Sequence, residues 1–180
     1  MNDLTLIPAT DAALPAEPFL ARHLIGGAWQ GSADGRSFDR ISPSHGVVVS
    51  RSALGGEAET LAAIAAARAA FDRGDWSRGT GKMRARVLLR VADLIEANVE
   101  RIALIETLES GKPITQARGE VSGAADLWRY AASLARTMHG DSHNSLGPDM
   151  LGVVLKEPVG VVSIITPWNF PFWIVSQKLP

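Results

Sequence analysis

Apolar residues in the middle of the chain recur every three or four positions, which is the spacing of an amphipathic helix. Four such stretches follow one another from about residue 61 to His139. Gly74, Gly111 and Gly140 close the first, third and fourth, because glycine readily takes the left-handed conformation that ends a helix. The residues expected on the apolar faces are Leu61, Ile64, Ala65, Arg68 and Phe71; Val87, Val91, Leu94, Ile95 and Asn98; Ile102 to Leu108; and Ala117, Val121, Ala124, Trp128, Ala131, Ala135 and Met138.

Short extended pieces precede the helices. His23–Ile25 and Ala28–Gln30 flank a Gly-Gly pair and predict a tight hairpin. Ser37–Ile41 and Val47–Ser50 flank Ser42–Gly46, whose composition is typical of a turn. The N-terminal part of the chain is therefore predicted to be built from small strands.

Three segments follow the helices. Residues 141–149 are polar and predict a loop, and Met150–Glu157 predicts an extended strand. Val159–Thr166 is apolar at almost every position, as in an interior parallel strand that is covered on both faces. The order of strands, helices and a final strand followed by a turn indicates an α/β fold.

Composition and charge exclude several classes of function. The chain has 18 basic and 19 acidic residues, and this balance offers no electrostatic footprint for nucleic acid or an anionic membrane. No apolar run approaches the ~18 residues that would span a bilayer. Residues 1–22, read as an irregular arm, carry Asp3, Asp11 and Glu17 but no basic residue before Arg22, unlike a secretory or mitochondrial leader. We therefore expect a cytoplasmic protein without nucleic-acid or membrane partners.

Several catalytic motifs are absent from the sequence. Without cysteine the chain has no thiol nucleophile, disulfide or zinc–thiolate site. The four histidines lack the spacing of metal ligands, so no metal site is predicted. Gly79–Lys82 looks like part of a phosphate loop, but Trp76 and Met83 replace the glycine and the hydroxyl residue that this loop requires. A turn before a helix is the better interpretation.

Asn169 is the strongest candidate for chemistry. It follows the carboxyl end of the predicted buried strand, where open α/β sheets bind their ligands. Its amide can donate hydrogen bonds to a developing oxyanion, and Pro167 and Pro171 restrict the backbone on both sides. Pro171 also suits the first turn of a helix through Phe172–Leu179. An ordinary turn in which Asn169 only holds the backbone is the alternative.

Six blocks of the sequence, in order, resemble the aldehyde dehydrogenase superfamily between Leu24 and Pro180. The most specific block, EPVGVVSIITPWNFP, resembles the family segment that ends in its catalytic asparagine, and the joint order of the six favours the catalytic reading of Asn169. The blocks are Leu24–Trp29, Ser42–Gly46, Ala65–Trp76, Arg84–Leu89, Glu106–Pro113 and Glu157–Pro171.

The resemblance implies the N-terminal part of a Rossmann-like cofactor domain, with short strands, four helices and one arm of a hairpin. Residues 23–140 would form the first part of that domain. Residues 141–157 would be the hairpin arm that pairs with another subunit in a homo-oligomer. Residues 158–180 would begin the Rossmann-like sheet and carry the PWNFP turn.

The resemblance also assigns roles to residues around the turn. Asn169 would be the catalytic amide that stabilises the oxyanion. Ile165, Thr166, Pro167 and Trp168 would line the NAD or NADP cofactor. Phe170 and Trp173 would lie at the mouth of the substrate tunnel, with core packing as an equal alternative.

In this family a cysteine thiolate attacks an aldehyde, hydride passes to NAD(P), and a glutamate-activated water releases the carboxylic acid. Because the thiol and the general base lie downstream in the family, this chain is expected to be a fragment, inactive by itself and not expected to bind the cofactor alone. The alternative is a naturally short, non-catalytic relative that pairs with a full-length subunit.

Overall fold

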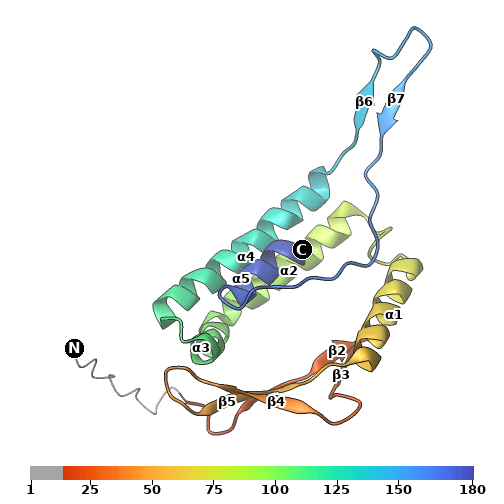
Figure 1. The fold of residues 1–180 in the computed structure, drawn as a ribbon. Helices are drawn as coiled ribbons and strands as arrows, with labels where there is room; N and C mark the ends of the chain where they lie inside the picture. Colours follow the sequence, from red (N-terminus) through yellow and green to blue (C-terminus); the bar gives the residue numbers. More distant parts are fainter. Residues whose placement is uncertain (1–13) are drawn as a thin grey trace, which may run out of the picture.

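The structure is a computed structural model that describes residues 14–180. It consists of a strand-rich base with one helix, a layer of four helices, and a hairpin that projects away from both (Figure 1). The elements are β1 (Phe19–Ala21), β2 (His23–Ile25), β3 (Ala28–Gln30), β4 (Ser37–Ile41), β5 (Val48–Ala53), α1 (Glu57–Arg73), α2 (Gly81–Ala97), α3 (Val99–Ser110), α4 (Ile114–Thr137), β6 (Asp141–His143), β7 (Gly152–Val154) and α5 (Pro171–Lys178).

The base contains two small sheets. β2 and β3 form the predicted hairpin, with His23 opposite Gln30, and β4 pairs antiparallel with β5 as expected from the intervening turn. The prediction of an irregular arm over residues 1–22 is wrong for its last part, because β1 pairs in parallel with β5. Single-sequence pattern missed this three-residue strand because its hydrogen bonds go to a segment about thirty residues away. The first thirteen residues of that predicted arm lie outside the described residues.

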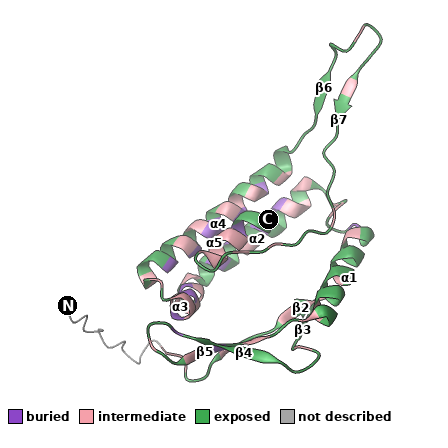
Figure 2. Ribbon diagram, viewed as in Figure 1, coloured by how far each residue is buried: buried purple, intermediate pink, exposed green. Residues whose placement is uncertain are grey.

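The core lies where α2, α3 and α4 meet (Figure 2). Ala85 and Ala92 of α2 face Ala117, Ala125 and their neighbours on α4. These small side chains let the two helices approach closely, and Trp128 fills the space at the edge of their contact. Alanine is therefore the commonest residue of the buried core between these helices.

The predicted apolar faces of α2 and α4 need correction. In α2 the buried face is Ala85, Leu88, Ala92 and Ile95, whereas Val87 and Leu94 are exposed. In α4 the inward positions Ala117, Val121, Ala124 and Trp128 are confirmed, but Ala132 is buried more deeply than Ala131 and Ala135, and Met138 lies beyond the helix and is exposed. Apolar periodicity gave too much weight to large residues, because the closest helix contacts here are made by alanine.

The first helix buries no side chain among residues 14–180. Its predicted apolar face is largely exposed, including Leu61 and Ile64. The helix begins at Glu57, ahead of the apolar pattern, and ends where the sequence predicts, since Gly74 follows it with a left-handed backbone (φ 82°). Gly111 ends α3 in the same way (φ 76°).

The predicted polar loop at 141–149 is partly wrong. Asp141–His143 forms β6, which pairs antiparallel with β7, so both arms of the hairpin lie in this chain. The polar side chains of β6 are all exposed, as on a hairpin that stands clear of the core. Polarity alone therefore did not distinguish this exposed strand from a loop.

The predicted buried strand at Val159–Thr166 is also not observed. The segment runs without strand pairing from the hairpin across the helices to α5 (Figure 1), and Val159 is 94% exposed. A strand needs a neighbour to satisfy its backbone N–H and C=O groups, and no strand among residues 14–180 lies beside it. Within residues 14–180, no helix is both long and apolar enough to cross a bilayer.

Candidate active site

The PWNFP turn joins the extended segment to α5. Trp168 and Asn169 form the turn, and Pro171 occupies the first turn of the helix, where the missing N–H of proline is not needed. The Phe170 carbonyl accepts a hydrogen bond from the Ile174 N–H at 3.0 Å, so Phe170 is the N-cap and the helix begins two residues after Asn169. The helix start predicted at Pro171 is confirmed.

Asn169 itself is exposed on this turn. No hydrogen bond of its side chain is found within residues 14–180, so its NH₂ group is free to donate to a ligand. An amide on a short turn directly before a docked helix has few backbone conformations available, which suits a group that must be oriented in advance. The arrangement can stabilise an oxyanion but contains no nucleophile or general base of its own.

The helix that follows Asn169 is anchored on α4. Phe172 packs against the core cluster, and Trp173 lies over Gly123, where an added Cβ would be 2.5 Å from Cζ3 of the indole. Ser176 is buried on the same helix, with its hydroxyl unpartnered among the described residues. These contacts fix the position of the helix relative to the α2–α4 layer.

Phe170 contacts a buried charge cluster. The Lys112 ammonium lies 4.5 Å from the centroid of the Phe170 ring and forms ion pairs with Glu106, at 2.7 Å, and with Glu120. The side chain of Lys112 is only 8% exposed and that of Glu106 4%. The three charges come from the link after α3, from α3 itself and from α4, so the cluster lies at the junction of these helices.

The buried setting perturbs the charges of this cluster. Burial raises the pKa of Glu106, although the hydrogen bond from Lys112 opposes this effect. Burial alone would lower the pKa of Lys112, but its hydrogen bonds to Glu106 and Glu120 outweigh burial and raise that pKa. Lys112 is therefore held as a cation beneath the Phe170 ring.

The sequence interpretation had overlooked this cluster. One signal was available: Glu106 falls within the otherwise apolar stretch of α3, and a buried carboxylate requires a partner. For Phe170 and Trp173, the observed contacts with Lys112 and Gly123 support the packing alternative. Their role in a substrate tunnel stays a prediction.

Three of the four residues assigned to the cofactor, Ile165, Thr166 and Pro167, lie in the extended segment before the turn, and Trp168 lies in the turn itself. Ile165 is 91% exposed and Trp168 79% exposed, and Thr166 is half-buried. The backbone of residues 161–167 makes no backbone hydrogen bond within the described part of the chain. The structure thus brings these residues next to Asn169 and leaves the side chains of Ile165 and Trp168 open to solvent.

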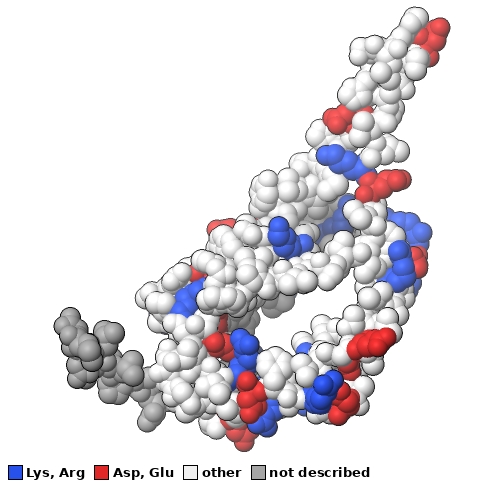
Figure 3. All heavy atoms as spheres, viewed as in Figure 1, with Lys and Arg blue, Asp and Glu red and all other residues white. Residues whose placement is uncertain are grey.

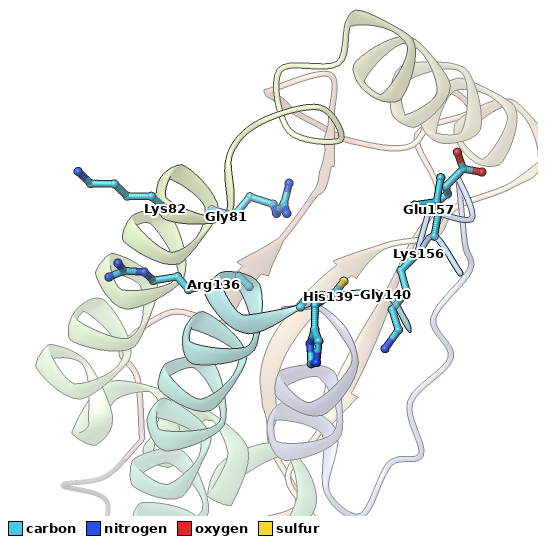
Figure 4. A pocket seen from close by; sticks show the side chains of 11 residues that line it. Gly81, Lys82, Arg136, His139, Gly140, Lys156 and Glu157 are labelled. Atoms are coloured by element: carbon cyan, nitrogen blue, oxygen red, sulfur yellow. The ribbon is translucent and has the colours of Figure 1, made fainter. Parts of the chain in front are cut away.

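One cavity among the described residues lies apart from this turn. This cavity of about 690 Å³ lies between the start of α2, the end of α4 and the segment after β7. Figure 4 shows that Lys82 and Arg136 extend to one side of it, away from His139 and Lys156. The Arg84 guanidinium donates to the Gly79 carbonyl at 2.5 Å and so supports the preceding loop. The basic side chains that line the cavity do not converge on one ligand position.

Charge and metal-binding groups point to no other site. On the face shown in Figure 3, acidic and basic side chains are interspersed. In the part of the chain that the structure describes, no three His, Asp or Glu side chains gather as metal ligands would. The turn at Asn169 is therefore the best-supported candidate.

Comparison with known proteins identifies the chain. The aldehyde dehydrogenase family model matches residues 29–180. Aldehyde dehydrogenase family 2 member C4 of Arabidopsis thaliana is 36% identical over 172 residues, which cover 95% of this chain and 34% of that protein. The mitochondrial succinate-semialdehyde dehydrogenase of the same plant is 40% identical over 156 residues, covering 87% of this chain and 29% of the relative.

Solved structures agree with the sequence relatives. An NAD-dependent aldehyde dehydrogenase from Sinorhizobium meliloti superposes with a TM-score of 0.87 at 51% identity, covering 91% of this chain and 33% of that one. Betaine aldehyde dehydrogenase from Staphylococcus aureus, in complex with NAD⁺, gives a TM-score of 0.83 at 35% identity, covering 88% and 32%. The chain thus spans about a third of the length of the relatives that it matches, and its α/β fold is that of their N-terminal part. The chain belongs to the aldehyde dehydrogenase family.

Proposed function

We propose that this chain supplies the oxyanion-binding amide and part of the cofactor contact surface of an NAD(P)-dependent aldehyde dehydrogenase. The reaction converts an aldehyde, NAD(P)⁺ and water into a carboxylic acid, NAD(P)H and a proton. The exposed, unpartnered amide of Asn169, placed between Pro167 and the anchored α5, is the observation that carries the proposal.

Asn169 would act on the carbonyl oxygen of the aldehyde. When a nucleophile adds to the carbonyl carbon, negative charge collects on this oxygen, and the Asn169 NH₂ donates a hydrogen bond to it. One such donor lowers the barrier by about 3–4 kcal/mol in comparable sites. The amide is neutral, so its contribution does not depend on a protonation state.

The segment before the turn fits a dinucleotide. Ile165 and Trp168 offer exposed apolar surface for the rings, and the unpaired backbone groups nearby can hydrogen-bond to ribose hydroxyls. Bound NAD(P)⁺ would serve as the hydride acceptor of the oxidation. The Staphylococcus aureus relative, which was solved with NAD⁺, supports this assignment.

The 180-residue chain has no cysteine, so we expect no aldehyde oxidation from it alone. The Staphylococcus aureus structure contains a BME-modified cysteine, which supports thiol chemistry in that relative. Cytoplasmic location stays a prediction from the sequence.

The hairpin formed by β6 and β7 is proposed to pair with a second subunit. It projects from the body of the molecule (Figure 1), and Leu151, Val153 and Leu155 on or beside β7 are exposed. A two-stranded hairpin is marginally stable alone, and pairing would bury these side chains. This supports a homo-oligomer as the working assembly.

A hybrid enzyme tests the catalytic role. Residues 24–180 would replace the matching segment of the Sinorhizobium meliloti enzyme, and oxidation of an aldehyde by NAD⁺ would be followed. We expect Asn169→Ala to lower kcat by roughly 100- to 1000-fold with little change in KM, because the lost donor acts on developing charge. Asn144→Ala, which changes an exposed amide in the hairpin loop, is the matched control.

Two results would contradict the proposal. An Asn169→Ala hybrid with unchanged kcat would remove the amide from the mechanism. A hybrid that assembles like its parent and binds NAD⁺ but does not turn over would contradict the enzymatic assignment. That second result would favour the alternative of a non-catalytic relative that pairs with full-length subunits.

A further inference from the structure

We propose that Lys112 is a positioning residue for the Asn169 turn and acts through the ring of Phe170. This inference rests on the proposed role of Asn169 for its catalytic meaning. The contact itself depends only on the geometry of the described residues. Lys112 lies far from Asn169 in the sequence, yet its ammonium is 4.5 Å from the centroid of the ring that follows Asn169.

The Lys112 ammonium is held in place by the carboxylates of Glu106 and Glu120. Its ion pairs with Glu106 and Glu120 join the ends of α3 and α4, and all three side chains are nearly inaccessible to solvent. The Lys112 backbone N–H also donates to the Ser110 hydroxyl at 3.2 Å. Since Gly111 takes a left-handed conformation just before it, the main chain directs Lys112 back towards the helices.

The Phe170 ring also contacts this cation, 4.5 Å from the ammonium. A cation over the face of an aromatic ring is attracted by the negative charge density of that face, and more strongly so where water is excluded. The ion pairs with Glu106 and Glu120 favour the charged form of the ammonium, so the ring faces a cation held in place from two sides. Phe170 is the residue before α5 and the residue after Asn169.

The other anchors of α5 cannot set the turn alone. Phe172 and Trp173 fix the body of the helix on α4, but both lie after Pro171. On the N-terminal side of Asn169, the side chains of Trp168 and Ile165 are exposed, so they do not anchor the turn to the helices. The Lys112–Phe170 contact is therefore the tie nearest to the amide, and its loss should loosen the turn while leaving the helix docked.

Nuclear magnetic resonance on the 180-residue chain tests the contact and its effect separately. The Lys112 ε-CH₂ protons should be shifted upfield by the ring current, and Phe170→Leu should abolish that shift. The backbone ¹⁵N heteronuclear NOE of Asn169 should be at the ordered level of α4 in the unaltered chain. It should fall in both Phe170→Leu and Lys112→Met, and Lys112→Arg should restore it because a guanidinium keeps the charge and can stack on the ring.

Two matched variants control for general effects. Phe71→Leu removes the contact in which Arg68 lies 4.4 Å from the half-buried Phe71 ring, and Arg118→Met removes an exposed ion pair with Glu100. Neither variant should change the backbone ¹⁵N heteronuclear NOE of Asn169. Lys112→Met leaves two buried carboxylates without a cation, so a triple variant with Glu106→Gln and Glu120→Gln provides a neutral cluster that can still fold.

An unchanged NOE at Asn169 in folded Phe170→Leu and in the folded triple variant would overturn the proposal. In the hybrid enzyme, Lys112→Met should lower kcat by about 10- to 100-fold with little change in KM, since small displacements of a catalytic group have effects of this size. If the NOE falls but Asn169→Ala leaves kcat unchanged, the positioning holds and the oxyanion role fails, so the two failures are distinguishable.

Discussion

The packing of Trp173 on Gly123 gives the sharpest test of how α5 is held. Replacing Gly123 by alanine would place a Cβ 3.1 Å from Cη2 of the indole, which is a tight contact, and 2.5 Å from Cζ3, which is closer than Cβ atoms in folded proteins approach. Gly119 lies one turn earlier on the same helix, and an added Cβ there would meet nothing within 4 Å. The two substitutions therefore share their effect on the helix backbone and differ only in the contact.

The expected changes in the free energy of unfolding follow from the helix-backbone effect and from the contact with Trp173. Glycine to alanine inside a helix stabilises it by about 0.8–1.0 kcal/mol, which is the effect expected for Gly119→Ala. Overpacking costs about 1–3 kcal/mol, so Gly123→Ala should be less stable than Gly119→Ala by that amount. For a chain of this size the difference corresponds to roughly 2–12 °C in Tm at about 2–4 °C per kcal/mol. The cost cannot exceed the free energy of docking α5, because the helix would detach first.

Urea unfolding followed by far-ultraviolet circular dichroism gives both free energies, and near-ultraviolet signals report the indole environment. A double variant, Gly123→Ala with Trp173→Leu, should recover part of the loss, since the shorter side chain vacates the space claimed by the new methyl group. If Gly123→Ala is as stabilising as Gly119→Ala, Trp173 does not lie on α4. The positioning of Asn169 by the helix layer would then be refuted as well.

Two further predictions concern charge and assembly. The pKa of Glu106 is raised in the folded protein, so the folded state binds more protons than the unfolded chain between pH 4.5 and the folded pKa. The contribution of Glu106 to the free energy of unfolding therefore falls as pH rises through that window. Glu106→Gln should remove this decline in a series of urea melts, and the same pH dependence in both proteins would contradict the prediction. Val153→Lys on exposed β7 should weaken subunit pairing in the hybrid enzyme and shift its sedimentation towards smaller species. Lys156→Gln, on the segment just after β7, is the control and should leave sedimentation unchanged. Unaltered sedimentation of Val153→Lys would argue against the hairpin as an interface.

Elements specified by local chemistry were predictable from the sequence. The β2–β3 hairpin follows from Gly26 and Gly27, which both take positive φ in the turn. The ends of α1 and α3 follow from Gly74 and Gly111, and the start of α5 follows from Pro171. In each case one residue type has a backbone preference strong enough to decide the local structure without help from the rest of the chain.

Features that depend on distant partners were not predictable in this way. The pairing of β1 with β5 and the closeness of Lys112 to Phe170 both join segments that are distant in sequence. The buried face of α2 was misassigned because alanine carries little weight in a hydrophobic pattern, although Ala85 and Ala92 are the residues that allow close approach to α4. Packing complementarity is a property of two surfaces, and periodicity describes only one of them.

The candidate site itself combines both kinds of information. Asn169 was selected because it should follow the carboxyl end of a buried strand, yet the segment before it makes no strand pairing within residues 14–180. The turn is instead located from its other side, through Trp173 on Gly123 and Phe170 on Lys112. Helix docking is therefore sufficient to place the amide in this structure. A strand formed by residues 159–166 would add a second constraint from the opposite direction and narrow the orientations open to Asn169 further.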